Sequence, residues 1–183
     1  IMSDLSSSEL PATQSLILER DKSVLKIWFN RPEAKNALSA EMTEELHAVL
    51  DAVCDDRSIR TIVLRGVGGV FCAGGDIKGF KSGMQATDAD EVAASNRSFG
   101  DLMIKLNEQP QVVIILVEGA AIGGGLGLAC VADVTLVTVD ARFRLSETSL
   151  GIPPAQIAPF VTERVGLTQA RRLMLTGARF KGE

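Results

Sequence analysis

Apolar residues recur along this sequence at two spacings, one typical of strands and the other of helices. Residues 15–21 (SLILERD) and 23–30 (SVLKIWFN) are short runs rich in apolar and β-branched side chains, and the polar turn between them predicts a β-hairpin. Across residues 39–54 the apolar side chains recur at helical spacing, and Ser39 stands where an N-cap is expected. The chain is therefore expected to open with two antiparallel strands and an amphipathic helix.

The middle of the chain continues as an alternation of apolar runs and helical patterns. The expected elements are a strand at 60–66 (RTIVLRG), a helix at 87–109, a strand at 112–117 (VVIILV), a short helix ending near 132 and a strand at 133–139 (DVTLVTV). Such alternation predicts parallel βαβ units, because strands that helices bury on both faces are continuously apolar. The fold class predicted from the pattern is α/β.

The two ends of the chain differ from this middle part. Residues 1–14 are polar and Ser-rich, and Ile1 ahead of Met2 looks like a cloning remnant, so we expect a flexible tail there. Residues 15–152 are expected to form the α/β core.

The pattern becomes helical in residues 153–183. Pro154 fits the first turn of one helix, and Thr168 can cap a second that Gly177 closes. Because the sequence stops soon afterwards without a finishing element, we expect this region to be only the start of a longer helical segment.

Composition narrows the possible partners. A length of 183 residues with 46% hydrophobic residues suffices for one domain with a sizeable core. A net charge of -4, a pI near 5.1 and the lack of a basic cluster disfavour binding to nucleic acid. No apolar run reaches the roughly 18 residues that span a bilayer, and the N-terminus lacks the pattern of a signal peptide. We expect a cytoplasmic protein with no nucleic-acid or membrane partner.

The cysteines and the histidine show no pattern of a disulfide, a metal site or a catalytic residue. Cys54, Cys72 and Cys130 are widely spaced and form no C-x-x-C pair, which disfavours a disulfide framework or a metal site and favours reduced, packed thiols. The sole histidine, His47, lies within the predicted helix and is expected at the surface. Motifs for binding a dinucleotide, for a P-loop and for a nucleophilic serine are absent from the glycine-rich segments.

Two glycine-rich turns follow predicted strands. Gly123–Gly125 come soon after VVIILV, and Gly74 and Gly75 follow RTIVLRG. Glycine lets another group approach the backbone, and the free N–H groups at a helix N-terminus suit an anion or a developing oxyanion. Close packing of the backbone is the alternative role for one such turn. The presence of two such turns in one βαβ array favours a role in binding an anion or oxyanion over close packing alone.

Four segments, in this order, resemble the crotonase (enoyl-CoA hydratase/isomerase) superfamily across residues 15–183: FNRPEAKNALS, VFCAGGDIKGF, VEGAAIGGGLGLACVADV and ARFRLSETSLGIPP. The resemblance implies a spiral of repeated ββα units, a homotrimer or dimer of trimers, and an acyl-coenzyme A thioester as substrate. No separate cofactor is implied, because coenzyme A is part of the substrate. The family's C-terminal helical segment, which helps cover the active site, is expected to be missing or truncated here.

The resemblance also assigns roles to the glycines. The backbone N–H of Gly75, after Ala73 and Gly74, and that of Gly124, beside Gly123, would form an oxyanion hole for the thioester enolate. Such donors act at the atom on which charge develops during the reaction.

Further residues of the same motifs would bind coenzyme A. The segment at Asp76 and Ile77 would receive the adenine, and Lys35 would meet the phosphates or the pantetheine. Asp76 can instead cap a turn, and Lys35 can instead be a solvated loop residue.

Glu147 in RLSETSLG matches the second catalytic glutamate of the hydratases and would act as acid and base. Gly127 stands where hydratases carry the first glutamate, and we expect it to leave room for a bulky acyl branch. A hydratase, a Δ3,Δ2-enoyl-CoA isomerase, another acyl-CoA enzyme of the family and a noncatalytic coenzyme A ester binder all stay open. The run PPAQIAPF is similar to hydratases of branched glutaconyl-CoA-type substrates, such as isohexenylglutaconyl-CoA hydratase, and favours hydration.

Overall fold

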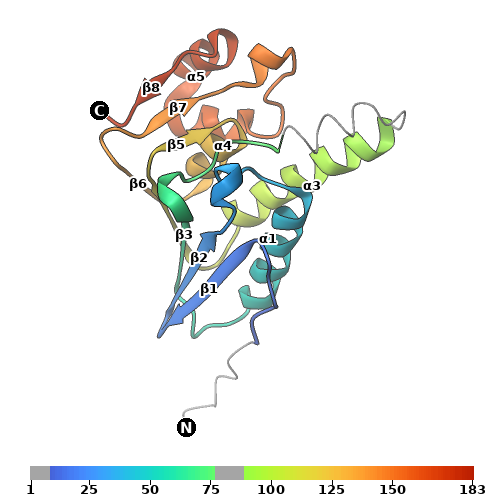
Figure 1. Ribbon diagram of the computed structural model, residues 1–183, viewed down its shortest axis with the longest axis vertical. Coiled ribbons are helices and arrows are strands. Elements are labelled where there is room, and N and C mark those ends of the chain that lie inside the picture. The colour runs from blue at the N-terminus through green and yellow to red at the C-terminus, as the bar shows by residue number, and fades with distance from the viewer. Residues whose placement is uncertain (1–8, 77–88) are drawn as a thin grey trace.

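The computed structural model describes residues 9–76 and 89–183, and its main feature is a five-stranded sheet (Figure 1). Only the first pair of strands is antiparallel, and the remaining neighbours are parallel. This confirms the predicted hairpin and the predicted parallel array. In sheet order the strands are β1 (Leu16–Asp21), β2 (Val24–Phe29), β3 (Thr61–Gly66), β4 (Val112–Val117) and β6 (Val134–Val137).

Helices α1 (Ala40–Val53) and α3 (Ala89–Asn107) lie side by side against this sheet (Figure 1). The hydroxyl of Ser39 accepts the N–H of Met42 at 3.2 Å, which confirms the predicted N-cap. Alternate side chains of β2 and the apolar stripe of α1 are fully buried between the layers, where the rings of Phe29 and Phe71 stack 5.3 Å apart.

A second, three-stranded sheet was not predicted from the sequence. It consists of β5 (Ala120–Ile122), β7 (Arg142–Arg144) and β8 (Phe180–Lys181), in that order. Strands of two or three residues are too short for a period of two to be recognised. Helix α4 (Gly124–Val131) follows β5, so β4, β5 and α4 form one ββα unit, and β6 and β7 begin the next. This is the expected spiral of ββα units.

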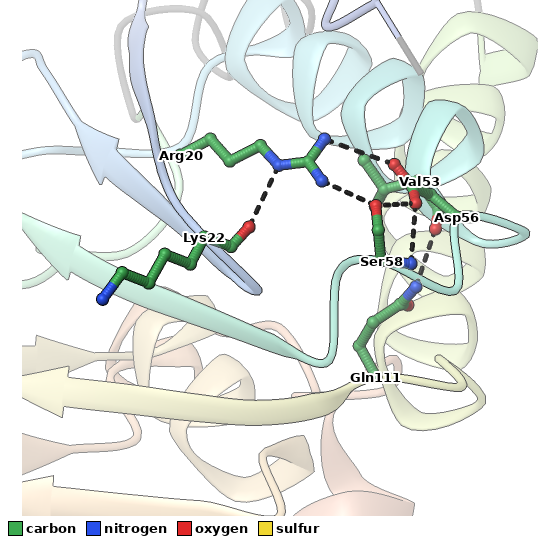
Figure 2. Close-up of polar contacts among 6 residues, drawn as sticks. All are labelled: Arg20, Lys22, Val53, Asp56, Ser58 and Gln111. Carbon is green, nitrogen blue, oxygen red and sulfur yellow. Dashed lines mark hydrogen bonds and ion pairs between the residues drawn. The ribbon is translucent and has the colours of Figure 1, made fainter. Parts of the chain in front are cut away.

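A buried polar cluster ties together the end of the first sheet (Figure 2). Asp56, whose side chain is 2% exposed, accepts the backbone N–H of Ser58 at 2.9 Å and pairs with Arg20 of β1 at 3.5 Å. Gln111, just before β4, donates to the carbonyl of Val53 at 2.7 Å. These bonds join the hairpin, the end of α1 and the start of β4.

The C-terminal helix α5 (Ala158–Thr176) begins later than predicted. Pro159 rather than Pro154 lies in its first turn, and the carbonyl of Pro154 accepts the N–H of Ala158 at 2.9 Å. Gly166 breaks the helix with φ 75° and ψ 157°, so two helical stretches are present as predicted. Gly177, with φ 58°, closes the second stretch as predicted.

The last residues of the predicted tail contact the body of the protein. Leu10 packs against the core, and the N–H of Gln14 donates to the carboxylate of Glu45 on α1 at 2.6 Å. These contacts hold the second half of residues 1–14 on the body of the protein, and residues 1–8 lie outside the described part.

None of the described helices combines the length and the apolarity needed to cross a bilayer. Within 9–76 and 89–183, no three His, Cys, Asp or Glu side chains gather in a way that could hold a metal ion.

The burial of the thiols predicts their reactivity. Burial raises the pKa of Cys72 to about 12 and that of Cys130 to about 11, whereas Cys54 is only half-buried at the end of α1. Because the thiolate is the reactive form, brief alkylation of the native protein at pH 8 should modify Cys54 alone. Mass spectrometry of tryptic peptides checks this, with denatured protein as the control in which all three thiols react. Rapid native labelling of Cys72 would contradict it.

Candidate active site

The two glycine-rich segments lie against each other. The N–H of Cys72 donates to the carbonyl of Ala120 at 3.0 Å, and the carbonyl of Cys72 accepts the N–H of Ile122 at 3.0 Å. A Cβ on Gly74 would meet the carbonyl oxygen of Ile122 at 3.0 Å, and one on Gly125 would meet Cys72 at 2.8 Å. Glycine at these positions therefore allows the two backbones to approach closely.

The N–H of Gly75 is free. Leu38 pairs opposite Gly75 by donating its N–H to the carbonyl of Gly74 at 2.8 Å and accepting the N–H of Asp76 at 2.9 Å. In parallel pairing this pattern directs the N–H of Gly75 away from Leu38. That N–H has no acceptor in the described part of the chain.

The N–H of Gly124 is also free, because Gly124 is the first residue of α4. The first backbone bond of this helix runs from the N–H of Gly127 to the carbonyl of Gly123 at 3.0 Å. Among the described residues nothing accepts the N–H of Gly124. The structure thus leaves both predicted oxyanion donors unpaired on adjacent segments. Gly124 in addition lies at a helix N-terminus, which favours negative charge.

The carboxylate of Glu147 reaches the same turn. Glu147 begins a short 3-10 helix, Glu147–Leu150, and its Oε1 lies 2.8 Å from the place that a Cβ on Gly123 would take. Its Oε2 is buried and has no hydrogen-bond partner among the described residues. Burial raises the pKa of the Glu147 carboxyl, and backbone groups of Glu147 and Ser146 counteract this only in part. A carboxyl group with a raised pKa therefore contacts Gly123, the residue before the free N–H of Gly124.

Gly123 is constrained twice. Its φ of 52° with ψ of -120° is a conformation that side chains disfavour, and the space for a side chain is taken by the Glu147 carboxylate. Its own N–H is paired with the carbonyl of Arg144 at 2.8 Å and is therefore not available to a ligand. Glycine at position 123 therefore leaves room for the Glu147 carboxylate, and its N–H is used within the protein.

Two apolar side chains pack against Gly124. Leu38 Cδ1 and Phe99 Cζ each lie 3.1 Å from the position of a Cβ on Gly124. Sequence reasoning did not single out either residue for the site. Leu38 immediately precedes the N-cap of α1, and this apolar position is the only local signal that it packs inward.

The expected room at Gly127 is absent. A Cβ on Gly127 would lie 2.3 Å from Cγ2 of Ile157 and 3.3 Å from the terminal methyl of Met103. The prediction that this glycine leaves space for a bulky acyl branch is therefore wrong, because the buried side chain of Ile157 already fills that space. Ile157 was not predicted as a site residue, and no local pattern marks it.

The residues predicted to bind coenzyme A lie beside the first donor turn. Lys35 is exposed, and its carbonyl accepts the N–H of Ala73 at 3.0 Å. The carboxylate of Asp76 forms an ion pair with Arg31 at 2.9 Å, with each side chain 22% exposed. Ile77 lies outside the described residues.

Comparisons with known proteins show which family the chain resembles. The family model "Enoyl-CoA hydratase/isomerase" matches residues 19–183. The structure of Pseudomonas aeruginosa AtuE is similar, with 57% identity and a TM-score of 0.90 over 92% of this chain and 65% of that chain. An enoyl-CoA hydratase/isomerase from Marinobacter aquaeolei shows 48% identity and a TM-score of 0.87 over 92% of this chain and 65% of that chain.

A curated relative supports the same assignment. The bacillaene synthase dehydratase PksH of Bacillus subtilis is 33% identical over 91% of this chain and 63% of its own length. The chain thus spans about two thirds of the length of these relatives. The family match and the site geometry together show that the chain belongs to the enoyl-CoA hydratase/isomerase family.

Proposed function

We propose that the full-length protein is an enoyl-CoA hydratase that adds water across the double bond of an α,β-unsaturated acyl-CoA thioester. The observation that carries this proposal is the buried carboxylate of Glu147 against Gly123, beside the free N–H of Gly124. Family membership supports an enzyme of the hydratase and isomerase class.

The proposed mechanism uses the two free N–H groups and one carboxylate. The thioester oxygen accepts hydrogen bonds from Gly75 and Gly124. Glu147 takes a proton from water as the hydroxyl oxygen attacks C3, and the electron pair of the double bond moves to the thioester oxygen as an enolate. The enolate then collapses as Glu147 returns the proton to C2. The fixed N–H donors stabilise the enolate because they need no reorganisation when the charge develops.

A raised pKa suits this exchange, because a proton carrier works best when its pKa lies near the operating pH. Burial raises the pKa of the Glu147 carboxyl in the required direction. One carboxylate must both remove and return the proton, since Gly127 offers no second acid.

The second candidate is a Δ3,Δ2-enoyl-CoA isomerase, which the lone carboxylate favours because one group can carry a proton from C2 to C4. A noncatalytic coenzyme A ester binder is favoured only by the missing acid at Gly127. The buried, unpaired Oε2 of Glu147 argues against a noncatalytic binder. A buried oxygen atom without a hydrogen bond lowers the stability of the protein, and binding alone gives no reason to keep it.

The proposed substrate is a branched glutaconyl-CoA-type thioester. The segment containing Ile157 supports this proposal by its resemblance to hydratases of such substrates. The branch would lie along the apolar side chains of Leu38 and Phe99, because Ile157 closes the space at Gly127. Lys35, exposed next to the first donor turn, is proposed to meet the phosphates of coenzyme A. A homotrimer, or a dimer of trimers, and a cytoplasmic location remain part of the proposal.

The test is to incubate the full-length protein with a panel of straight and branched enoyl-CoA thioesters, following the conjugated thioester absorbance and the product masses. Addition of water supports the hydratase, and a double-bond shift without a mass change supports the isomerase. Tight binding with no product across the panel would support the binder.

In the same assay Glu147→Gln should abolish turnover and leave thioester affinity within a few-fold, because the amide cannot take up and return the proton. Undiminished turnover would remove Glu147 from the mechanism.

A matched pair of variants tests the oxyanion hole. Gly75→Pro removes the N–H, which no described residue uses, whereas Gly75→Ala keeps it in a place where nothing lies within 4 Å of a new Cβ. We expect kcat of the proline variant to fall about 100- to 1000-fold, the usual loss for one oxyanion donor. The alanine variant should retain most of the parent rate. Steady-state kinetics measure both, with circular dichroism as the check on folding, and equal losses in the two variants would argue against the donor role.

The pH dependence of kcat/KM tests the buried carboxyl. Water activation needs Glu147 ionised, so activity should be lost as the pH falls through the pKa of this group in the free enzyme. Since burial raises that pKa above the ordinary glutamate value of 4.5, the acidic limb should lie at a higher pH than an ordinary carboxyl would give. Kinetics from pH 4 to 9, with unfolding followed at each pH, locate the limb. A limb at or below pH 4.5 in folded enzyme would contradict the assignment.

A further inference from the structure

Arg144 is bonded to the active-site turn through its backbone. It is the last residue of β7, and its carbonyl accepts the N–H of Gly123 at 2.8 Å. The strand that carries Arg144 therefore holds the residue immediately before the oxyanion donor Gly124. Glu147 follows only three residues later, so the end of β7 is linked both to the Gly123–Gly124 turn and to the proposed proton carrier.

The side chain of Arg144 joins two other elements. Its Nε donates to the carbonyl of Gly177 at 3.0 Å, and its Nη2 donates to the hydroxyl of Ser149 at 2.5 Å. Gly177 is the αL residue that ends α5, and Ser149 lies in the 3-10 helix that starts with Glu147. A cation at the C-terminus of a helix also interacts favourably with the helix dipole. The guanidinium thus fixes the short helix to the last turn of α5.

A second bond joins the same two elements. The hydroxyl of Thr148, the neighbour of Ser149, donates to the carbonyl of Met174 in the last turn of α5. Apolar burial contributes little here, because Thr148 and Ser149 are exposed and Leu150 is 56% exposed. Polar bonds, rather than a packed core, therefore hold the short helix in place.

We propose that Arg144 is a positioning residue, which holds the 3-10 helix Glu147–Leu150 on α5 and so keeps the Glu147 carboxylate against Gly123. The role rests on the proposed function of Glu147 as the proton carrier. Arginine suits this position because its planar fork reaches two separate acceptors at fixed angles, which the single ammonium of lysine does not do. Misplacing a catalytic group by about 1 Å can cost about 100-fold in rate.

Three variants of the full-length protein test this. Arg144→Gln removes the charge and the fork, Arg144→Lys keeps the charge alone, and Arg142→Gln is the control on the same strand, where the side chain is exposed. Both Arg144 variants should lose about 10- to 100-fold in kcat with KM changed less than about threefold, because position and not affinity is lost. The Arg142 variant should stay within about twofold of the parent. A parental kcat in Arg144→Gln would overturn the proposal, as would equal losses in all three variants.

A second measurement separates this proposal from the proposed function. Hydrogen exchange of the amides at 147–151 should be faster in both Arg144 variants, while exchange in α1 stays at the parental rate. If the parent turns over no thioester, the proposed function fails, yet the exchange result still decides whether Arg144 holds the short helix. Unchanged exchange at 147–151 would overturn the proposal. Should Arg144→Gln fail to fold, Ser149→Ala removes one acceptor without touching the charge, and its kcat and exchange are read in the same way.

Discussion

The site depends on the hydrogen bonds that hold the segment Cys72–Asp76 between Leu38 and β5. Leu38 uses the carbonyl and the N–H on either side of Gly75, and β5 uses both backbone groups of Cys72. The N–H of Gly75 takes no part in this pairing and points away from Leu38. The pairing of the strands alone thus leaves the N–H of Gly75 unpaired, and no side chain is needed to supply this hydrogen-bond donor.

Much of this architecture could be predicted from the sequence, because the long strands and amphipathic helices follow a clear period. The sheet of β5, β7 and β8 could not, since two or three residues carry no recognisable period. The start of α5 was misplaced because Pro154 and Pro159 both satisfy the local rule for a first helical turn, and only the bonds formed in the fold distinguish them.

The glycine turns and Glu147 were found from motifs, whereas the surrounding residues were not. Phe99 and Ile157 come from segments distant in sequence, so their approach to Gly124 and Gly127 is a property of packing alone. The error at Gly127 has the same origin. A missing side chain means free space only if no neighbour fills it, and close-packed interiors fill such gaps. Arg144 was missed because its bonds to Ser149 and Gly177 exist only after α5 has folded back.

The residues around Gly123 and Gly124 differ in how much substitution they tolerate. Gly123 itself tolerates almost none, whereas the apolar neighbours of Gly124 can vary. Backbone donors and a carboxylate pressed against a positive-φ glycine leave almost no sequence freedom, because any side chain at 123 would be strained and would displace the acid. Leu38 and Phe99 are less constrained, since they pack against Gly124 only through apolar contact. Under the proposed function, evolution can therefore change the acyl group that is accepted by substituting Leu38 and Phe99, while the backbone donors and Glu147 are retained in each descendant enzyme.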